Sequence, residues 1–550
     1  MARSPRKPRA SATVVQAAPP SPVDPSSVET VSVRMYRGLL GDCFLLTHQL
    51  GDRRFRVLFD CGVLQAIGNG KDATKAGVAH IGAVVQNLFD DTGGVIDLVV
   101  ATHEHYDHLS GFILHFEVWQ KFTIRALWLA WTENYGDALA NDIRQGRSKG
   151  LAALAALVET ATSGAPRPFG IAQDDPALVE SVTQIRDLLQ FYGEIEPAIS
   201  GGGQALTGAG TGTGTGTANP RPAGRPPQVP PRSCLDVLDW LKSKVEAANV
   251  RYLEPGQQVR FGLDDRLKAT VFGPPRGRNR LLQLDPSAGP AREVYLAQPG
   301  EANALATTLQ LRMDGDAAAA VVDGGYPFAA RFRRNEDERS QDPLARLYFE
   351  EGARNAARRI DGEWLGSAET LALKIDGDVN NTSLALAVEV PGRDVLLFPA
   401  DAQVGNWLSW HDQKYPAKPD MPDTPQESAE QILNRVVFYK VGHHASHNAT
   451  AREKGLELML SPDLVAMIPV VEAVAKEQKT KNNVDGWAMP YGDLYARLKD
   501  KTRQRIVRGD GDVQAESAAF AAAGGRFTLH YADGTAEPLW AEVAMVCRPA

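Results

Sequence analysis

The residues most able to do chemistry lie in one short segment, His103-Glu104-His105-Tyr106-Asp107-His108. Four of the 11 histidines in the chain lie between positions 103 and 115. Residues 95–100, just before this segment, form a short apolar run rich in β-branched residues, which is typical of a buried strand. The segment is therefore expected to turn sharply from a strand into a helix.

On such a turn, His103 and His105 could bind one metal ion while Asp107 and His108 bind a second. Nitrogen and oxygen ligands of this mix suit zinc, with manganese or iron as alternatives. We expect two zinc ions per chain. The other interpretation, a solvated polar loop, gives no physical reason for the order His-x-His-x-Asp-His.

Five other short segments carry polar residues beside apolar, strand-like runs. In chain order they are Gly41-Asp42-Cys43-Phe44, Phe59-Asp60-Cys61-Gly62, Asn380-Asn381-Thr382-Ser383-Leu384, Phe398-Pro399-Ala400-Asp401 and Lys440-Val441-Gly442-His443-His444-Ala445-Ser446. Together with His-x-His-x-Asp-His, they resemble the metallo-β-lactamase superfamily over roughly residues 30 to 510. The details are similar to its phosphodiesterase and nuclease-like branch, which includes the hydrolase domain of the ComEC-type DNA-uptake protein.

This resemblance implies an α/β fold, an αββα sandwich of the metallo-β-lactamase type with large insertions. It also implies that Asp401 bridges the two metals, although a strand-end aspartate is otherwise a common turn former. His443, the first histidine after its strand, is preferred over His444 as the remaining ligand of the second metal. His444, Ser446 and His447 would then lie beside the metals as hydrogen-bond donors to a phosphate or an oxyanion.

In many metallo-β-lactamase-fold enzymes, a histidine between the His-x-His-x-Asp-His motif and the bridging aspartate completes the first metal site. This chain departs from that pattern, because no histidine lies between His115 and Asp401. The branch's pattern suggests that Asn380 or Asn381 takes the missing place, although asparagine is a weaker ligand than imidazole. Asp60 is expected to accept a hydrogen bond from a ligand histidine and to fix its tautomer. Its alternative role is a strand-end turn.

This ligand set predicts a metal-dependent hydrolase with a metal-bridging hydroxide as nucleophile. Phosphodiester hydrolysis of a nucleic acid or nucleotide fits best, with Asp107, His444 and His447 as catalytic residues. One alternative is hydrolysis of a small ester, lactone or thioester; another is a partner-binding effector subunit of a larger system, such as a defence system. A basic track to the metals would favour a nuclease, and a closed pocket would favour a small substrate.

Composition narrows these classes further. With 43% hydrophobic and 23% charged residues, the chain has the make-up of an ordinary globular protein. Its net charge of −8 argues against a broadly basic surface that coats nucleic acid. Cys43, Cys61, Cys234 and Cys547 lack metal-type spacing and are expected to be buried free thiols in a reducing compartment. Without a long apolar run or a secretory signal, the chain is expected in the cytoplasm and off the membrane.

The motifs predict one large domain over residues 30–550, preceded by a disordered arm over residues 1–29. Residues 198–232, almost all Gly, Thr, Ala and Pro, are expected to form a flexible loop. Residues 276–370 exceed what the fold needs; we expect a substrate-restricting cap or a surface for a protein partner, or else a solvated helical decoration. Strands are expected at residues 31–36, 44–48, 55–60, 95–100, 123–131, 250–273, 371–375, 383–390, 395–399, 435–441, 527–531 and 540–547, and helices at 76–89, 108–119, 135–161, 175–192 and 234–249.

Overall fold

The computed structural model describes most of the chain but not every segment. It describes residues 28–64, 71–162, 230–283, 377–416, 425–478, 485–532 and 537–549, together with residues 182, 185, 189, 192 and 375. The predicted N-terminal arm, the Gly-Thr loop and the insertion at 276–370 therefore lie almost wholly outside the described residues. Within the described ranges, no helix is both long and apolar enough to cross a membrane.

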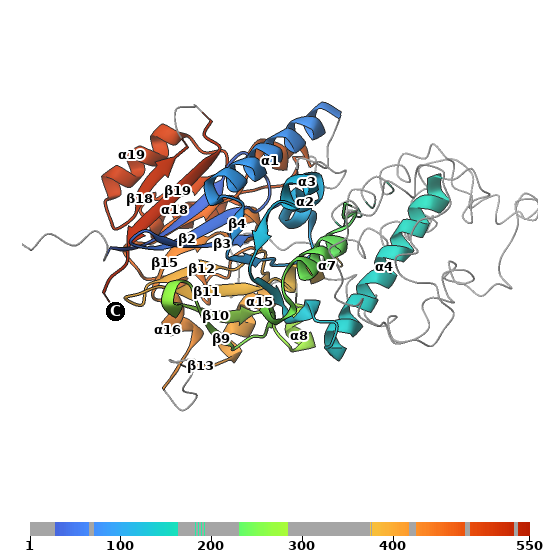
Figure 1. Cartoon of the computed structure of the whole chain (residues 1–550), viewed down its shortest axis with the longest axis horizontal. Coiled ribbons are helices and arrows are strands. Elements are labelled where there is room, and N and C mark those ends of the chain that lie inside the picture. The colour runs from blue at the N-terminus through green and yellow to red at the C-terminus, as the bar shows by residue number, and fades with distance from the viewer. Residues whose placement is uncertain are drawn as a thin grey trace, which may run out of the picture.

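The first main sheet has eight strands in the order β18-β19-β1-β2-β3-β5-β7-β8. Both ends of the chain contribute, since β1 pairs with β19 along its length; Figure 1 shows the red β18 and β19 in the same sheet as the blue β2. The strands from β3 to β8 run parallel to one another. Their bounds are β18 (Thr528–Tyr531), β19 (Trp540–Val546), β1 (Glu29–Tyr36), β2 (Phe44–Leu50), β3 (Arg53–Phe59), β5 (Leu98–Val100), β7 (Leu127–Ala130) and β8 (Val250–Leu253).

The second main sheet has seven strands in the order β17-β16-β15-β12-β11-β10-β9. The four strands from β12 to β17 are parallel, and the others pair antiparallel. Their bounds are β17 (Ile506–Arg508), β16 (Val465–Ile468), β15 (Val436–Lys440), β12 (Val395–Phe398), β11 (Ala385–Glu389), β10 (Leu267–Gly273) and β9 (Gln258–Phe261). Two short strand pairs complete the described sheets: β4 (Val95–Ile96) with β6 (Thr123–Ile124), and β13 (Tyr415–Pro416) with β14 (Gln426–Glu427).

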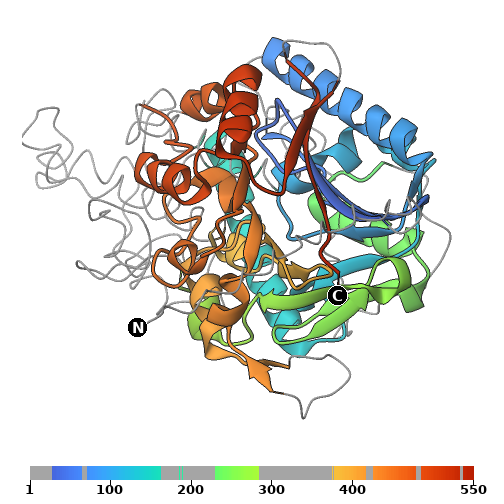
Figure 2. The same cartoon turned by 90° about the vertical axis from the view of Figure 1, so that its left-hand side faces the viewer.

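The two main sheets pack face to face, because each strand turns alternate apolar side chains toward the other sheet. Val33 and Val57 of the first sheet share one buried cluster with Val271 and Leu396 of the second. Helices cover the outer faces: in Figure 2, α1 and the orange-to-red helices lie on opposite sides of the strands. The protein is therefore an α/β protein with two central sheets between helical layers.

The helices divide between these outer faces as the apolar clusters show. The first sheet is covered by α1 (Lys71–Thr92), α2 (Tyr106–Leu114), α3 (Phe116–Trp119) and α7 (Cys234–Lys244). The second is covered by α15 (Val404–Ser409), α16 (Ala429–Leu433), α17 (Glu472–Glu477) and α18 (Gly492–Thr502). The other described α-helices are α4 (Ala138–Thr162), α8 (Arg278–Leu281) and α19 (Val513–Ala523), and the 3-10 helices are Trp131–Glu133, Ala247–Asn249, Leu263–Asp265, Trp410–Asp412, Gly442–Ala445 and Leu456–Leu458.

Most predicted strands and helices that fall on described residues are present, with shifted ends. Three predictions of a single strand are wrong. Residues 123–131 form β6 and β7, and residues 250–273 form β8, β9 and β10. Residues 95–100 form β4 and β5 on either side of Asp97. The Asp97 carboxylate accepts a hydrogen bond from the backbone N–H of Arg56 and another from Arg125, so this residue does not continue the apolar strand. The predicted strand at 371–375 lies outside the described residues except for Ile375, which is helical.

Several strands of the two sheets end close together at one edge of the sandwich. The rings of Phe59, at the end of β3, and Phe398, at the end of β12, stack at 4.1 Å between centroids. Close by, a Cβ added to Gly62 would lie 2.3 Å from the carbonyl carbon of Asp107, so only glycine lets the start of α2 approach the chain after β3. This edge carries the polar segments identified from the sequence.

Candidate metal centre

The candidate site lies where parallel strands of both sheets end. Asp60 follows β3, and the segment His103–His108 follows β5, which pairs in parallel with β3. Asp401 follows β12 and His444 follows β15, the parallel neighbour of β12. Because carboxyl ends of parallel strands share an edge, groups as far as 337 residues apart in sequence come together in the fold.

Four buried side chains form the centre of this site: Asp107, His108, Asp401 and His444. One ligand atom from each lies within 4.8 Å of the others. Asp401 Oδ2 is 3.3 Å from His108 Nε2 and 3.9 Å from His444 Nε2, while Asp107 Oδ2 is 3.8 Å from His108 Nε2 and 2.9 Å from His444 Nε2. Ligands of a tetrahedral zinc ion lie about 3.3–3.5 Å apart, given bonds of about 2.0–2.2 Å. The spacing fits a cation bound by four residues.

The hydrogen bonds of two histidines turn their remaining ring nitrogens toward this centre. His108 donates Nδ1–H to Asp60 Oδ2 at 2.8 Å, and His444 donates Nδ1–H to the carbonyl of Pro469 at 2.8 Å. Each Nε2 then faces a carboxylate oxygen of Asp107 or Asp401. Two lone pairs repel, so a proton or a metal cation has to lie between these atoms.

A second pair of histidines lies beside the four-residue group. His103 Nε2 is 3.1 Å from His105 Nδ1, and the rings of His103 and His108 are 4.1 Å apart. Thr102 donates its one hydroxyl proton to Asp60 at 2.6 Å, so its oxygen accepts Nδ1–H from His103 at 3.0 Å. The Nε2 lone pair of His103 is therefore directed toward His105.

Asp60 sets the tautomers of two histidines at once. It accepts Nδ1–H of His108 directly and orients His103 through the Thr102 hydroxyl, and its other oxygen accepts the backbone N–H of Thr102 at 2.8 Å. The side chain is 1% exposed. A buried carboxylate behind a ligand histidine is the usual partner that fixes the ring in metal sites.

Negative charge accumulates at this edge. Asp42, Asp60, Asp107 and Asp401 are all buried there, beside the buried amine of Lys440. Burial alone would lower the pKa of His108, but these four carboxylates raise it well above its usual value. The electrostatic preference of the site is for added positive charge, which a divalent cation provides.

The other titratable candidate ligands have environments suited to metal binding. Burial would raise the pKa of Asp107, but His108 and the hydrogen bond from His444 outweigh it and lower this pKa to about 2. Burial, together with the nearby His108, lowers the pKa of His105 to about 4 against the opposing effect of Asp107. Burial also holds the pKa of His103 well below its usual value. At neutral pH these groups are an ionised carboxylate and neutral imidazoles, the forms that coordinate metals.

The backbone around the centre adopts an uncommon conformation. Five of the ten non-glycine residues with positive φ in the described part of the chain lie here: Asp60, Ala400, His443, His444 and Ala445, with φ between 44° and 62°. Left-handed conformations of such residues are costly and concentrate at functional sites.

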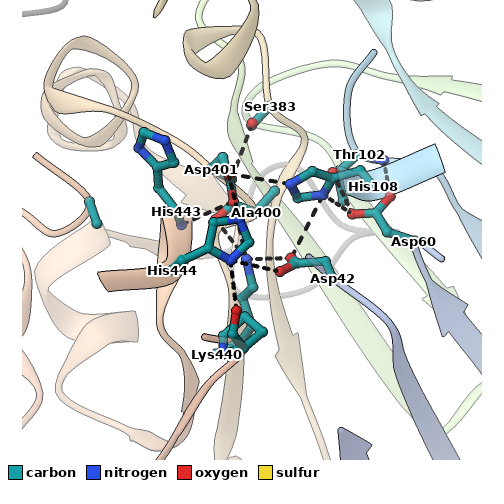
Figure 3. Close-up of polar contacts among 12 residues, drawn as sticks. Asp42, Asp60, Thr102, His108, Ser383, Ala400, Asp401, Lys440, His443 and His444 are labelled. Atoms are coloured by element: carbon teal, nitrogen blue, oxygen red, sulfur yellow. Dashed lines mark hydrogen bonds and ion pairs between the residues drawn. The ribbon is translucent and has the colours of Figure 1, made fainter. Parts of the chain in front are cut away.

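The positions of the two adjacent histidines differ from the sequence expectation. Asp401 Oδ1 accepts the backbone N–H of His443 at 3.0 Å, but the His443 ring binds Ser446 Oγ at 2.9 Å and points away from the centre (Figure 3). His444 supplies the ring that faces Asp107. The sequence preferred His443 as the ligand, whereas the structure brings His444, and not His443, into the four-residue group. His447 is exposed, with its ring 6.4 Å from that of Tyr491, and is not part of the four-residue group.

Asn381 is also placed differently from the expectation. Its amide nitrogen donates to the carbonyls of Arg280, Leu281 and Gln283, and its oxygen accepts the backbone N–H of Asn406. Both ends of this amide hold α8 and α15 together, so the prediction of Asn381 as a metal ligand does not fit these contacts. Its alternative, Asn380, is buried at 1% exposure.

Sequence reasoning assigned no role to three residues that contact the site. Thr102 relays Asp60 to His103, Lys440 donates to Asp401 at 3.2 Å, and Asp42 forms a buried ion pair with Lys440. The sequence could have indicated these three residues, because each is a polar residue at an end of a predicted buried strand.

Comparison with known proteins adds no relative, since no protein-family model matches the chain and no curated protein matches it either. What fold and site define together is an α/β protein with a buried His/Asp group that could hold a metal ion.

Proposed function

We propose that this chain is a metallo-β-lactamase-fold hydrolase that binds two divalent metal ions, zinc first, and cleaves phosphodiester bonds in a nucleic acid or nucleotide. Two sheets packed between helices, with the motifs of the ComEC-like branch at one sheet edge, support the fold part of this proposal. The single observation that carries the functional part is the group formed by Asp107, His108, Asp401 and His444.

In this proposal that four-residue group would hold the second metal, and His103 and His105, with Asp401 as the shared ligand, would hold the first. The buried Nε2 of His108 and Oδ1 of Asp107 make no hydrogen bond, which fits atoms reserved for a cation. Thr102 and Asp60 keep the imidazoles in the tautomers that coordinate metal.

The residues also account for the choice of reaction class. Divalent cations at such a site would supply a water acidified to a pKa near 7 and would neutralise charge on phosphoryl oxygens. The carboxylates and imidazoles are buried, so they would present the metal ions to a substrate in a preorganised arrangement. Phosphodiester hydrolysis benefits most, because its transition state spreads negative charge over several oxygens.

Metal content and activity measured together test this function. Wild type and Asp107→Ala are analysed for zinc, manganese and iron by mass spectrometry, with circular dichroism as the control for folding. Both proteins are assayed on bis-p-nitrophenyl phosphate, single- and double-stranded DNA, RNA and a lactone. We expect metal in wild type, less metal in the variant, and phosphodiester cleavage by wild type only.

Other outcomes separate the alternatives. Equal metal content in the two proteins would remove Asp107 from the site. Cleavage of the lactone alone would replace the phosphodiesterase with a small-ester hydrolase. Metal-free wild type without activity on any substrate would favour a partner-binding role.

A further inference from the structure

Lys440 is the buried cation next to the candidate metal centre, and the ligand set leaves it without a role. Its side chain is 2% exposed at the end of β15 (Figure 3). The ammonium contacts three oxygens: Asp42 Oδ2, Asp401 Oδ1 at 3.2 Å and the carbonyl of Ala400 at 3.1 Å. A buried lysine is costly unless it is paired, so this position is maintained by the contacts it makes.

The two oxygens of the Asp401 carboxylate have different partners. Oδ1 accepts hydrogen bonds from Lys440 Nζ and from the backbone N–H of His443 at 3.0 Å. Oδ2 instead faces His108 Nε2 at 3.3 Å and His444 Nε2 at 3.9 Å. With both donors on Oδ1, the carboxylate presents one oxygen to the cluster.

We propose that Lys440 is a positioning residue that holds Asp401 Oδ1 away from the metal-binding cluster, so that Asp401 binds the metals through Oδ2 alone. This role rests on the proposed two-metal function and deepens it. A carboxylate bound through both oxygens would take a coordination position that substrate or water needs. Neighbours that orient a ligand in this way typically contribute about 10- to 100-fold in metal affinity or activity.

Asp42 offers a competing explanation, in which Lys440 serves only the buried ion pair. Asp42 comes from the segment before β2, so the pair links the two sheets at the site edge. Replacing both members of a buried pair removes the charge cost together with the attraction, and is often neutral for stability. The double variant can therefore separate the two roles.

The test compares wild type, Asp42→Asn and Asp42→Asn/Lys440→Met, each reconstituted with Zn²⁺ for kinetics and with Co²⁺ for visible absorption. The single variant keeps the bond from Lys440 to Asp401 and serves as the matched control. We expect the double variant to fold, to lose about 10- to 100-fold in kcat on bis-p-nitrophenyl phosphate, and to show weaker Co²⁺ absorption as the coordination number rises. The single variant should stay closer to wild type in both measurements. Asp42→Leu/Lys440→Met replaces the double variant if that protein does not fold.

Two results would overturn the role of Lys440 while the proposed function stands. One is a folded double variant with wild-type kcat and Co²⁺ spectrum. The other is an equal loss in the single and double variants, which would assign the effect to Asp42. Wild type that binds neither Zn²⁺ nor Co²⁺ would overturn the proposed function and, with it, this inference.

Discussion

Replacing Asp60 by asparagine changes one atom of the candidate site and tests how the histidines are oriented. The carboxylate accepts three hydrogen bonds: Thr102 N–H on Oδ1, and Thr102 Oγ–H and His108 Nδ1–H on Oδ2. An amide accepts at only one end. Whichever way the introduced amide is turned, its NH₂ faces a group that donates a hydrogen bond to Asp60 in the wild type.

The two orientations predict the size of the effect. With NH₂ toward the backbone of Thr102, a buried N–H loses its acceptor, which costs about 1–3 kcal/mol of stability. With NH₂ toward His108, the ring is forced to carry its proton on Nε2, the atom that faces Asp401. Metal binding must then reverse the tautomer, and we expect a metal Kd about 10- to 100-fold higher, or roughly 1.4–2.7 kcal/mol. Asp42 cannot replace Asp60 without movement, since its Oδ2 is 3.8 Å from His108 Nδ1.

The assay measures the zinc Kd by chelator competition, and stability by urea unfolding in EDTA. Asp97→Asn is the matched control: this carboxylate also accepts two hydrogen bonds and its side chain is only 8% exposed, but it lies at the amino end of β5, away from the site. The control should lose stability and keep the wild-type zinc Kd. A wild-type zinc Kd together with wild-type stability in Asp60→Asn would refute the argument, because each orientation of the amide predicts one of these two losses.

Three other predictions concern Asp401 as the proposed bridging ligand, the packing of the motif helix and pH. Asp401→Asn should lose at least about 100-fold in phosphodiester turnover and keep its melting temperature in EDTA within a few degrees. The reason is that Lys440 and the His443 N–H hold the amide oxygen and turn the NH₂ toward the proposed metals. A retained kcat would contradict this. Gly62→Ala should lose about 3 kcal/mol or more by urea unfolding, since its Cβ overlaps backbone, whereas Gly492→Ala, which meets nothing within 4 Å, should lose none. Burial would raise the pKa of Glu29, but hydrogen bonds from Arg266 and His48 lower it. Glu29→Gln should therefore reduce the free energy of unfolding by about 1–2 kcal/mol at pH 7, and by progressively less as the pH falls below about 4. A difference in unfolding free energy that does not change with pH would rule out the ion pair as its source.

The parts of the site that follow directly from strand ends could be predicted from the sequence. Asp107, His108 and Asp401 each come shortly after an apolar run, and the structure brings them together. The mixed α/β architecture also follows, since buried strands with β-branched residues alternate with amphipathic helices. Both depend on local pattern and short range, which sequence reasoning captures well.

The expectations that the structure did not bear out depend on distant contacts, on very short strands and on backbone dihedrals, none of which shows in a local sequence pattern. Asn381 could be taken for a ligand because its three carbonyl acceptors lie about a hundred residues earlier in the chain. Strands β16 and β17 were not predicted, because four and three residues are too few to show a period. The choice between His443 and His444 depended on backbone dihedrals that neither histidine favours.

That left-handed run explains why the site is built as it is. Successive positive φ values at His443, His444 and Ala445 let one short segment do two things. The backbone N–H of His443 binds Asp401 Oδ1, while the His444 ring reaches Asp107. Each such residue costs about 1–2 kcal/mol, so three consecutive ones persist only where the surrounding contacts determine them. Glycine would adopt this backbone without that cost, so the contacts with Asp401 and Asp107 are what hold these three residues in it.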